Sequence, residues 1–205
     1  MRHIFKQGED PHAPVLLLLH GTGGTEKDLL PIGSMLSPGS SVLSVRGNVS
    51  EHGMPRFFKR LAEGVFDEED LIFRTRELNA FLLESSEKYG FDRGNLIAVG
   101  YSNGANIAGS LLFHYEDALK GAILFHPMVP RRGLKLPDLS GIRTFIGAGE
   151  NDPLIPVEET NELVRLLSGA DADVEMHWER NGHQLSSGEI GAARKWLEEN
   201  YLTES

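Results

Sequence analysis

The stretch "NLIAVGYSNGANIAGSLL", residues 95–112, places one serine between a strand pattern and a helix pattern. Its centre, Gly100 to Gly104, fits G-x-S-x-G, the motif of a sharp strand-to-helix turn that lifts the hydroxyl of Ser102 clear of a sheet. The apolar run of residues 96–99 predicts a buried strand. Small and apolar residues then recur every three or four positions, which predicts a helix packed closely on that sheet. The alternative is a glycine-rich loop that contains a serine by chance, so the motif needs support from the rest of the chain.

Short apolar runs alternate with helical patterns along the whole chain, which is typical of an α/β protein with a mostly parallel central sheet and helices on both faces. The expected strands are Ile4 to Lys6, Val15 to Leu19, Val42 to Val45, Leu96 to Val99, Ala122 to Phe125, Thr144 to Ile146 and Val174 to Trp178. The expected helices run from a cap at Asp70 to Gly90, over Val157 to Ser168, and from Ser186, which forms an S-x-x-E capping box with Glu189. Residues 47–66 lack a clear period, and a loop of that length is usually functional or mobile.

Composition limits the classes of function. A chain of 205 residues with 40% hydrophobic content suits one compact core, so we expect a single domain over residues 1–205. A net charge of −10 disfavours a nucleic-acid partner. The chain has no cysteine, which excludes disulfides, thiolate metal sites and a cysteine nucleophile. The amino terminus lacks a signal-peptide pattern and no apolar run is long enough for a membrane span, so we expect a cytoplasmic protein.

A catalytic serine needs a base within hydrogen-bond reach and an acid that orients the base. After this type of serine motif, the acid and then the histidine each follow a later strand. Asp152 lies in a turn after one expected strand, and His183 follows an Asn-Gly turn after the next. We therefore expect Ser102, Asp152 and His183 to form a catalytic triad. Three alternatives stay open: Glu150 is the rival acid, Asp152 is an ordinary Asp-Pro turn residue, or His183 is a solvated turn histidine.

Seven other histidines compete with His183 for the role of base. His177 lies within an expected strand, which favours a structural role. His20 and His126 lie at strand ends, where they would line the site without acting as the base. His126 is therefore a candidate substrate-binding residue.

Acyl transfer also needs N–H donors for the negative oxygen of the tetrahedral intermediate. The N–H of Asn103, directly after the serine at a helix N-terminus, is the first expected donor of this oxyanion hole. The second is expected from the loop "HGTGG", residues 20–24, with Thr22 as the first choice and Gly23 as the second. A phosphate-binding loop is disfavoured, because these residues lack the G-K-[ST] ending of a P-loop and the G-x-G-x-x-G pattern.

Residues 47–66 are the expected wall of the substrate site. Met54, Phe57 and Phe58 would cover an acyl or aryl group, and Arg56 would hold a substrate carboxylate. The structural alternative is equally open for the apolar side chains, which would pin the loop to the core. For an exposed loop arginine such as Arg56, solvation is the more common outcome.

As a set, the segments 20–24, 100–104, 151–153 and 182–183 resemble the motifs of the small carboxylesterase/phospholipase branch of the α/β-hydrolase superfamily. This branch includes acyl-protein thioesterases and the bacterial quinone-inducible hydrolases, which the chain resembles most, over nearly its whole length. The resemblance implies an α/β-hydrolase fold and a Ser-His-Asp ester hydrolase without cofactor or metal, cytoplasmic and often homodimeric. The HGTGG loop departs from the HGGG type of lipases, and dienelactone hydrolases differ by their cysteine nucleophile.

The expected function is cleavage of small or medium acyl or aryl carboxylic esters through an acyl-enzyme on Ser102. The chain is too short for a separate lid domain, so the site should be shallow. One alternative is a thioesterase or lysophospholipase that acts on longer acyl chains. The other is a non-catalytic hydrolase-like binding module, for which a broken triad would be expected.

Overall fold

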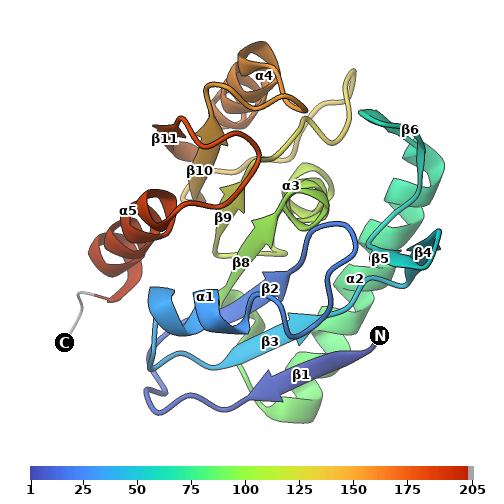
Figure 1. Cartoon of the computed structure of the whole chain (residues 1–205). Coiled ribbons are helices and arrows are strands. Elements are labelled where there is room, and N and C mark those ends of the chain that lie inside the picture. Colours follow the sequence, from blue (N-terminus) through green and yellow to red (C-terminus); the bar gives the residue numbers. More distant parts are fainter. Residues whose placement is uncertain (203–205) are drawn as a thin grey trace.

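The computed structural model describes residues 1–202, and its centre is a seven-stranded sheet with the strand order β1-β3-β2-β8-β9-β10-β11 (Figure 1). The strands are β1 (His3–Lys6), β2 (Val15–Leu19), β3 (Val42–Val45), β8 (Leu96–Tyr101), β9 (Gly121–Phe125), β10 (Arg143–Gly149) and β11 (Asp173–Glu179). β1 pairs antiparallel with β3, and all other neighbours in this sheet are parallel. The predicted strands and the mostly parallel arrangement are confirmed.

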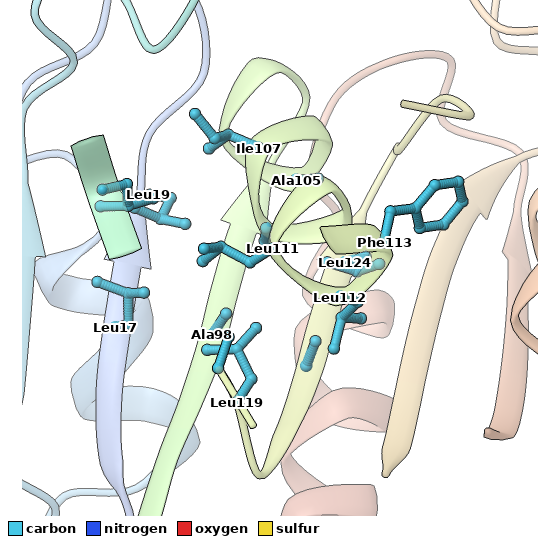
Figure 2. Close-up of a cluster of buried hydrophobic side chains, with 14 of the residues drawn as sticks. Leu17, Leu19, Ala98, Ala105, Ile107, Leu111, Leu112, Phe113, Leu119 and Leu124 are labelled. Atoms are coloured by element: carbon cyan, nitrogen blue, oxygen red, sulfur yellow. The ribbon is translucent and has the colours of Figure 1, made fainter. Parts of the chain in front are cut away.

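Both faces of the sheet are buried, because successive side chains of a strand point to opposite faces. In β2, Leu17 and Leu19 belong to one hydrophobic cluster, and Leu16 and Leu18 belong to the other. Figure 2 shows part of the first cluster, in which side chains of a helix lie over those of neighbouring strands. Burial on both sides explains why these strands are continuous apolar runs rather than alternating ones.

Helices cover both faces, as predicted. The first cluster contains residues from α2 (Glu68–Tyr89), α3 (Asn103–His114) and α4 (Val157–Gly169), whereas the second contains residues from α1 (Leu30–Leu36) and α5 (Ser187–Leu197). A 3-10 turn, η1 (Arg93–Asn95), precedes β8, and a π-helical turn, η2 (Glu198–Leu202), follows α5. Among residues 1–202 no separate lid domain is present. No helix in this range has both the length and the apolar character that a membrane span requires.

The helix ends follow local rules, with one correction. The N-cap of α2 is Asp67, whose side chain accepts the N–H of Asp70, so the predicted cap at Asp70 is wrong by three residues. Asp70 instead accepts the N–H of Lys59 at 2.7 Å. The C-cap at Gly90 is confirmed, with a left-handed φ of 71°. The capping box of α5 is also confirmed, with both reciprocal bonds between Ser186 and Glu189 present.

Residues 47–66 are not a loop without structure. They form two small antiparallel hairpins, β4 (Val49–Glu51) with β5 (Met54–Arg56) and β6 (Arg60–Ala62) with β7 (Val65–Phe66). Strands of two or three residues are too short to show an alternating pattern, so periodicity could not find them.

The topology brings four loops to one edge of the sheet. Because β8, β9, β10 and β11 are parallel neighbours, their carboxyl ends lie together, which is where ligands bind in α/β proteins. Ser102 directly follows β8 and His126 follows β9, while Asp152 and His183 lie in the loops after β10 and β11. Residues that are far apart in the sequence thus meet at this edge.

Candidate active site

Ser102 occupies the turn between β8 and α3 with a strained backbone, φ 51° and ψ −114°. A non-glycine residue rarely adopts positive φ, and such strain is held only where the surroundings require it. The turn is fixed by the Ser102 N–H, which donates to the carbonyl of Phe125 at 2.9 Å. A Cβ on Gly104 would lie only 2.0 Å from the carbonyl oxygen of Leu19, and one on Gly100 would lie 2.6 Å from the backbone of the turn. The two glycines of the motif are therefore needed for close backbone approach.

The three predicted triad residues form a continuous hydrogen-bonded chain. His183 Nε2 lies 2.8 Å from the Oγ of Ser102, and His183 Nδ1 lies 2.7 Å from Oδ2 of Asp152. The other carboxylate oxygen of Asp152 accepts the backbone N–H groups of Leu154 at 2.8 Å and Ile155 at 3.2 Å. The Asp152 side chain is almost fully buried and that of His183 is 18% exposed. This geometry allows the imidazole to take a proton from the serine while the carboxylate fixes the orientation of the ring.

The loop that carries His183 is tied to its neighbours on both sides. The N–H of Gly182, a residue with φ 61°, donates to the side chain of Asn151 at 3.0 Å. The hydroxyl of Tyr101, at the end of β8, donates to the carbonyl of His183 at 2.7 Å. The histidine is thereby held between the loop of the acid and the strand of the serine.

The electrostatics of the site keep Asp152 ionised. Burial alone would raise the pKa of its carboxyl, but the hydrogen bonds from His183, the Leu154 N–H and His126 outweigh burial and lower this pKa. Burial, together with the charges of Asp152 and Glu189, raises the pKa of Tyr101 and keeps its phenol protonated as a donor. The acid therefore accepts hydrogen bonds at neutral pH and does not compete for the serine proton.

The competing acid and histidines lie elsewhere. Glu150 is half exposed and pairs with Arg180 at 3.6 Å. His177 contacts Glu179 at 2.9 Å on β11, away from the serine. His20, expected to line the site, is buried behind it: its Nε2 accepts the N–H of Gly47, and burial lowers its pKa, so the ring is neutral.

The oxyanion donors expected from sequence differ in availability. Among residues 1–202, neither the N–H of Thr22 nor that of Asn103 donates to another protein group. The N–H of Gly23 donates to the carbonyl of Pro55 at 2.9 Å, so Gly23 is wrong as an alternative donor. Both Thr22 and Asn103 lie with Ser102 in the lining of one cleft.

The segment from Pro55 to Phe57 holds both candidate donors in place. Besides the bond from the Gly23 N–H to Pro55, Nη1 of Arg56 donates to Oγ1 of Thr22. The N–H of Phe57 donates to the side-chain oxygen of Asn103 at 2.7 Å. The hairpin segment that the sequence suggested as a substrate wall thus braces the backbone on both sides of the serine.

A cleft that is open to solvent lies above Ser102. Its lining combines polar and charged side chains with apolar ones: Thr22, Arg56, Arg60, Glu63, Gly64, Phe66, Asn103, Asn106, Met128, Leu154, Ile155 and His183. None of the apolar lining residues was singled out individually from the sequence. A signal existed for Leu154 and Ile155, which directly follow the acid, and for Asn106, one helical turn beyond the serine. Phe66 lies within residues 47–66, the expected wall, and Met128 lies just after His126, but no local pattern singles out either side chain.

Of the five predicted substrate residues, only Arg56 lines this cleft. It is not a solvated arginine: its side chain is 4% exposed, burial lowers its pKa to about 10, and its Nε donates to the carbonyl of Phe58. Phe57 and Phe58 are 1% and 0% exposed in the core, so the prediction that they contact substrate is wrong. Met54 is exposed beside Gly23, outside the cleft lining. His126 is buried beneath the cleft against Asp152, so its prediction as a wall residue is also wrong.

His126, Asp152 and His183 offer ligand atoms that lie within 4.8 Å of one another, the only such group of metal-binding side chains among residues 1–202. Both imidazoles direct Nδ1 at the same oxygen, Oδ2 of Asp152, at 3.1 and 2.7 Å. These contacts are hydrogen-bond lengths with a proton between the atoms. A metal ion would have to displace those protons and break the link from His183 to the acid, so the donor set fits a hydrogen-bonded cluster better than a metal centre.

Comparison with known proteins gives consistent matches. A family model described as Phospholipase/Carboxylesterase matches residues 3–201. The Bacillus subtilis (strain 168) protein named "Putative hydrolase MhqD" is 58% identical over 199 residues, 97% of this chain and 98% of that protein. A crystal structure of a Bacillus cereus carboxylesterase is 62% identical with a TM-score of 0.97, covering 98% of this chain and 95% of that one. A structure of YahD with malic acid is 34% identical with a TM-score of 0.93, covering 97% and 98% of the two chains.

Proposed function

The chain belongs to the phospholipase/carboxylesterase family of α/β-hydrolases, and on this premise we propose that it cleaves carboxylic esters through an acyl-enzyme on Ser102. The observation that carries the proposal is the chain of hydrogen bonds from Ser102 through His183 to Asp152, beside two unpaired N–H groups. We further propose that the whole chain acts as one cytoplasmic catalytic domain without cofactor, as a monomer or a homodimer.

The first half of the reaction forms the acyl-enzyme. Nε2 of His183 takes the proton of the Ser102 hydroxyl while Oγ attacks the ester carbonyl carbon. The carbonyl oxygen becomes negative and accepts the N–H groups of Thr22 and Asn103. The intermediate then collapses: the bond to the alcohol oxygen breaks, and His183 returns its proton to that oxygen. The alcohol leaves and the acyl group stays on Ser102.

The second half of the reaction hydrolyses the acyl-enzyme and regenerates the free hydroxyl of Ser102. Water enters the cleft and loses a proton to Nε2 of His183 as its oxygen attacks the acyl carbon. Collapse of the second intermediate breaks the bond to Ser102 Oγ, which takes the proton from His183, and a carboxylic acid leaves. Asp152 stays ionised throughout and stabilises the imidazolium that forms in each half.

The open cleft and its few apolar side chains favour a small or medium acyl or aryl group. Phe66, Met128 and Leu154 supply the apolar surface, and no lid is available among residues 1–202 to enclose a long chain. The guanidinium of Arg56 lines the same cleft, and its Nη2 has no acceptor among the described residues. A carboxylate on the substrate would supply one, and YahD was solved with malic acid, a dicarboxylic acid.

The proposal is tested with a fluorophosphonate probe, which reacts covalently with an activated serine. We expect labelling at Ser102 in the wild type and none in Ser102→Ala, with turnover of a nitrophenyl ester reduced on the order of 10⁶-fold in that variant. Ser168→Ala is the matched control, because Ser168 is an exposed serine on α4 outside the lining of the cleft, and unchanged labelling is expected.

Absence of labelling in the wild type would favour the binding-module alternative and refute the proposal. A series of nitrophenyl esters of graded acyl length distinguishes the remaining alternatives. We expect kcat/KM to fall as the acyl chain grows beyond the cleft. A steady increase up to long chains would instead identify a thioesterase or lysophospholipase.

A further inference from the structure

A second imidazole lies behind the triad. His126 follows β9 with a strained φ of 53°, and its backbone N–H donates to the carbonyl of Gly147 at 2.7 Å. Its side chain is fully buried. Its Nδ1 lies 3.1 Å from Oδ2 of Asp152, the same oxygen that is hydrogen-bonded to Nδ1 of His183. The catalytic acid therefore shares one oxygen between two histidines.

A second buried carboxylate lies on the far side of His126. Oε1 of Glu189 is 2.9 Å from Nε2 of His126, and both side chains are 0% exposed. Oε2 of Glu189 accepts the N–H of Ser186 in the capping box of α5. A Cβ on residue 147 would lie 2.9 Å from Oε1, so Gly147 leaves the space that Glu189 occupies. The capping glutamate thus has a second contact that helix capping does not require.

The arrangement favours a protonated His126. If the ring were neutral with its proton on Nδ1, Nε2 would carry a lone pair only 2.9 Å from an oxygen of a buried carboxylate, and no positive charge would offset that carboxylate. The contact to Glu189 lacks the alignment of a hydrogen bond, so it is an electrostatic pairing of buried charges. Burial alone would lower the pKa of His126, but Glu189 and Asp152 together outweigh burial and raise it.

Four groups surround this imidazole. Asp152 and Glu189 contact its two nitrogens, the ring of His183 lies 5.3 Å away between centroids, and the ring of Tyr101 lies 6.1 Å away. We propose that His126 is a positioning residue for the catalytic acid: it shares Oδ2 of Asp152 with His183, and its charge, held by Glu189, sets the pH range in which His183 activates Ser102. This inference rests on the proposed function, because it assigns a role within the same triad.

The direction of the effect follows from charge. A positive charge on His126 offsets part of the negative charge of Asp152 and disfavours a second positive charge on His183 nearby. His183 then stays neutral, and able to accept the serine proton, down to a lower pH. If His126 is removed or neutralised, Asp152 stabilises a protonated His183 more strongly. The acidic limb of the activity profile should therefore move to higher pH.

Glu189→Gln is the more specific test of the charge on His126. Glutamine at this position keeps the capping box with Ser186, because S-x-x-Q serves as well as S-x-x-E, and only the charge that holds His126 protonated is lost. His126→Asn is the second variant, since asparagine tolerates positive φ but carries no imidazole. His177→Gln is the matched control: it removes another histidine with a glutamate contact at 2.9 Å, on the exposed side of β11 and without a bond to Asp152.

The readout is the rate of fluorophosphonate labelling of Ser102 between pH 4.5 and 9, together with kcat and KM for one nitrophenyl ester. We expect the acidic limb to move up by roughly half a pH unit in Glu189→Gln and by about one unit in His126→Asn. The plateau of kcat should fall roughly tenfold in His126→Asn while KM changes little, because the lost bond orients the acid and does not hold substrate. His177→Gln should keep the wild-type profile.

An acidic limb that stays in place in folded Glu189→Gln, or that moves to lower pH, would overturn the inference and assign the pair a structural role only. The imidazole resonances of the wild type give a second, independent check: His126 should remain protonated at pH 7, and a neutral ring there overturns the inference even if both variants fail to fold. Failure of the proposed function can be distinguished from failure of this inference, because in the first case the probe would not label Ser102 in the wild type at any pH.

Discussion

Arg56 is the residue whose interpretation changes most between sequence and structure. In the sequence it is one basic residue in a polar stretch, and solvation is the simplest expectation. In the structure it is buried, donates to Thr22 and to the carbonyl of Phe58, and lies 3.5 Å from Glu51, which pairs more closely with Arg60. A buried guanidinium that lines the cleft can both hold the Thr22 loop in place and contact substrate.

These two roles of Arg56 can be separated by mutation. Thr22→Ala keeps the backbone N–H but removes the hydroxyl that Arg56 holds, so we expect kcat to fall roughly tenfold, less than the 10²–10³-fold typical of a lost oxyanion donor. Arg56→Met should lower kcat at least as much. It should also raise KM for esters that carry a carboxylate, whereas Thr22→Ala should leave that KM unchanged. Steady-state kinetics on a neutral ester and its carboxylate analogue measure both effects.

Arg76→Met is the control for this pair, because Arg76 is an exposed arginine of α2 outside the cleft lining. Wild-type kinetics are expected. If Arg56→Met raised KM equally for the neutral and the charged ester, the arginine would act only as a brace, and the carboxylate contact would be refuted.

At the scale of the elements, the contact between α3 and β2 fixes the position of Ser102. Helix α3 begins directly after Ser102, and its first turn lies against the carbonyl of Leu19 at the end of β2. Nearly every residue of α3 is buried, so the helix has little freedom to shift outward. The turn geometry therefore depends on the close approach of two backbones, together with the hydrogen bond from the Phe57 N–H to the Asn103 side chain.

Gly104→Ala tests this dependence. The added Cβ would lie 2.0 Å from the oxygen of Leu19, so we expect a loss of several kcal/mol in the free energy of unfolding, or failure to fold, and a large fall in Ser102 labelling. Gly191→Ala on α5 is the same substitution where a Cβ meets no atom within 4 Å. There we expect a gain of about 0.5–1 kcal/mol, because alanine favours a helix interior. Urea denaturation measures both, and equal effects of the two substitutions would contradict the argument.

At the scale of the whole molecule, a buried carboxylate in the connection after β2 links the residues that flank β1 and β3 at one edge of the sheet. Glu26 is 4% exposed in its side chain and pairs with Arg2 at 3.0 Å and Arg46 at 2.5 Å. Burial alone would raise the pKa of Glu26, but its backbone N–H and Arg46 outweigh burial and lower it. A folded-state pKa below the unfolded value gives stability that is present above the unfolded pKa and is lost as pH falls through the folded one.

Glu26→Gln should therefore lower the free energy of unfolding at pH 7 by about 1–3 kcal/mol, since the two arginines lose their charged partner. The difference from the wild type should shrink as pH falls below the unfolded-state pKa of about 4.3 and through the lower folded-state pKa of Glu26. Urea denaturation from pH 3 to 7 measures this convergence. Glu116→Gln, a control at an exposed glutamate, should follow the wild-type curve. If the loss of unfolding free energy in Glu26→Gln stayed constant with pH, the electrostatic account would be refuted.

The sequence by itself determined the features that depend on neighbouring residues. These are the buried strands, the glycine-flanked serine turn, the end of α2 at Gly90 and the capping box of α5, because each follows from apolar runs, glycine spacing or a capping residue within a few positions. The order of the acid and the histidine was also readable, since each comes directly after a strand and parallel strands end at one edge.

Only the tertiary structure decided which of these residues face substrate and which are buried. Phe57 and Phe58 lie in the core while Arg56 beside them lines the cleft, and no local pattern separates them because two- and three-residue strands have no period. The contact of Glu189 with His126 joins α5 to the loop after β9 across 63 positions. Such pairings depend on how elements pack, and packing is set by shape and charge across the whole sheet rather than by the residues next in sequence.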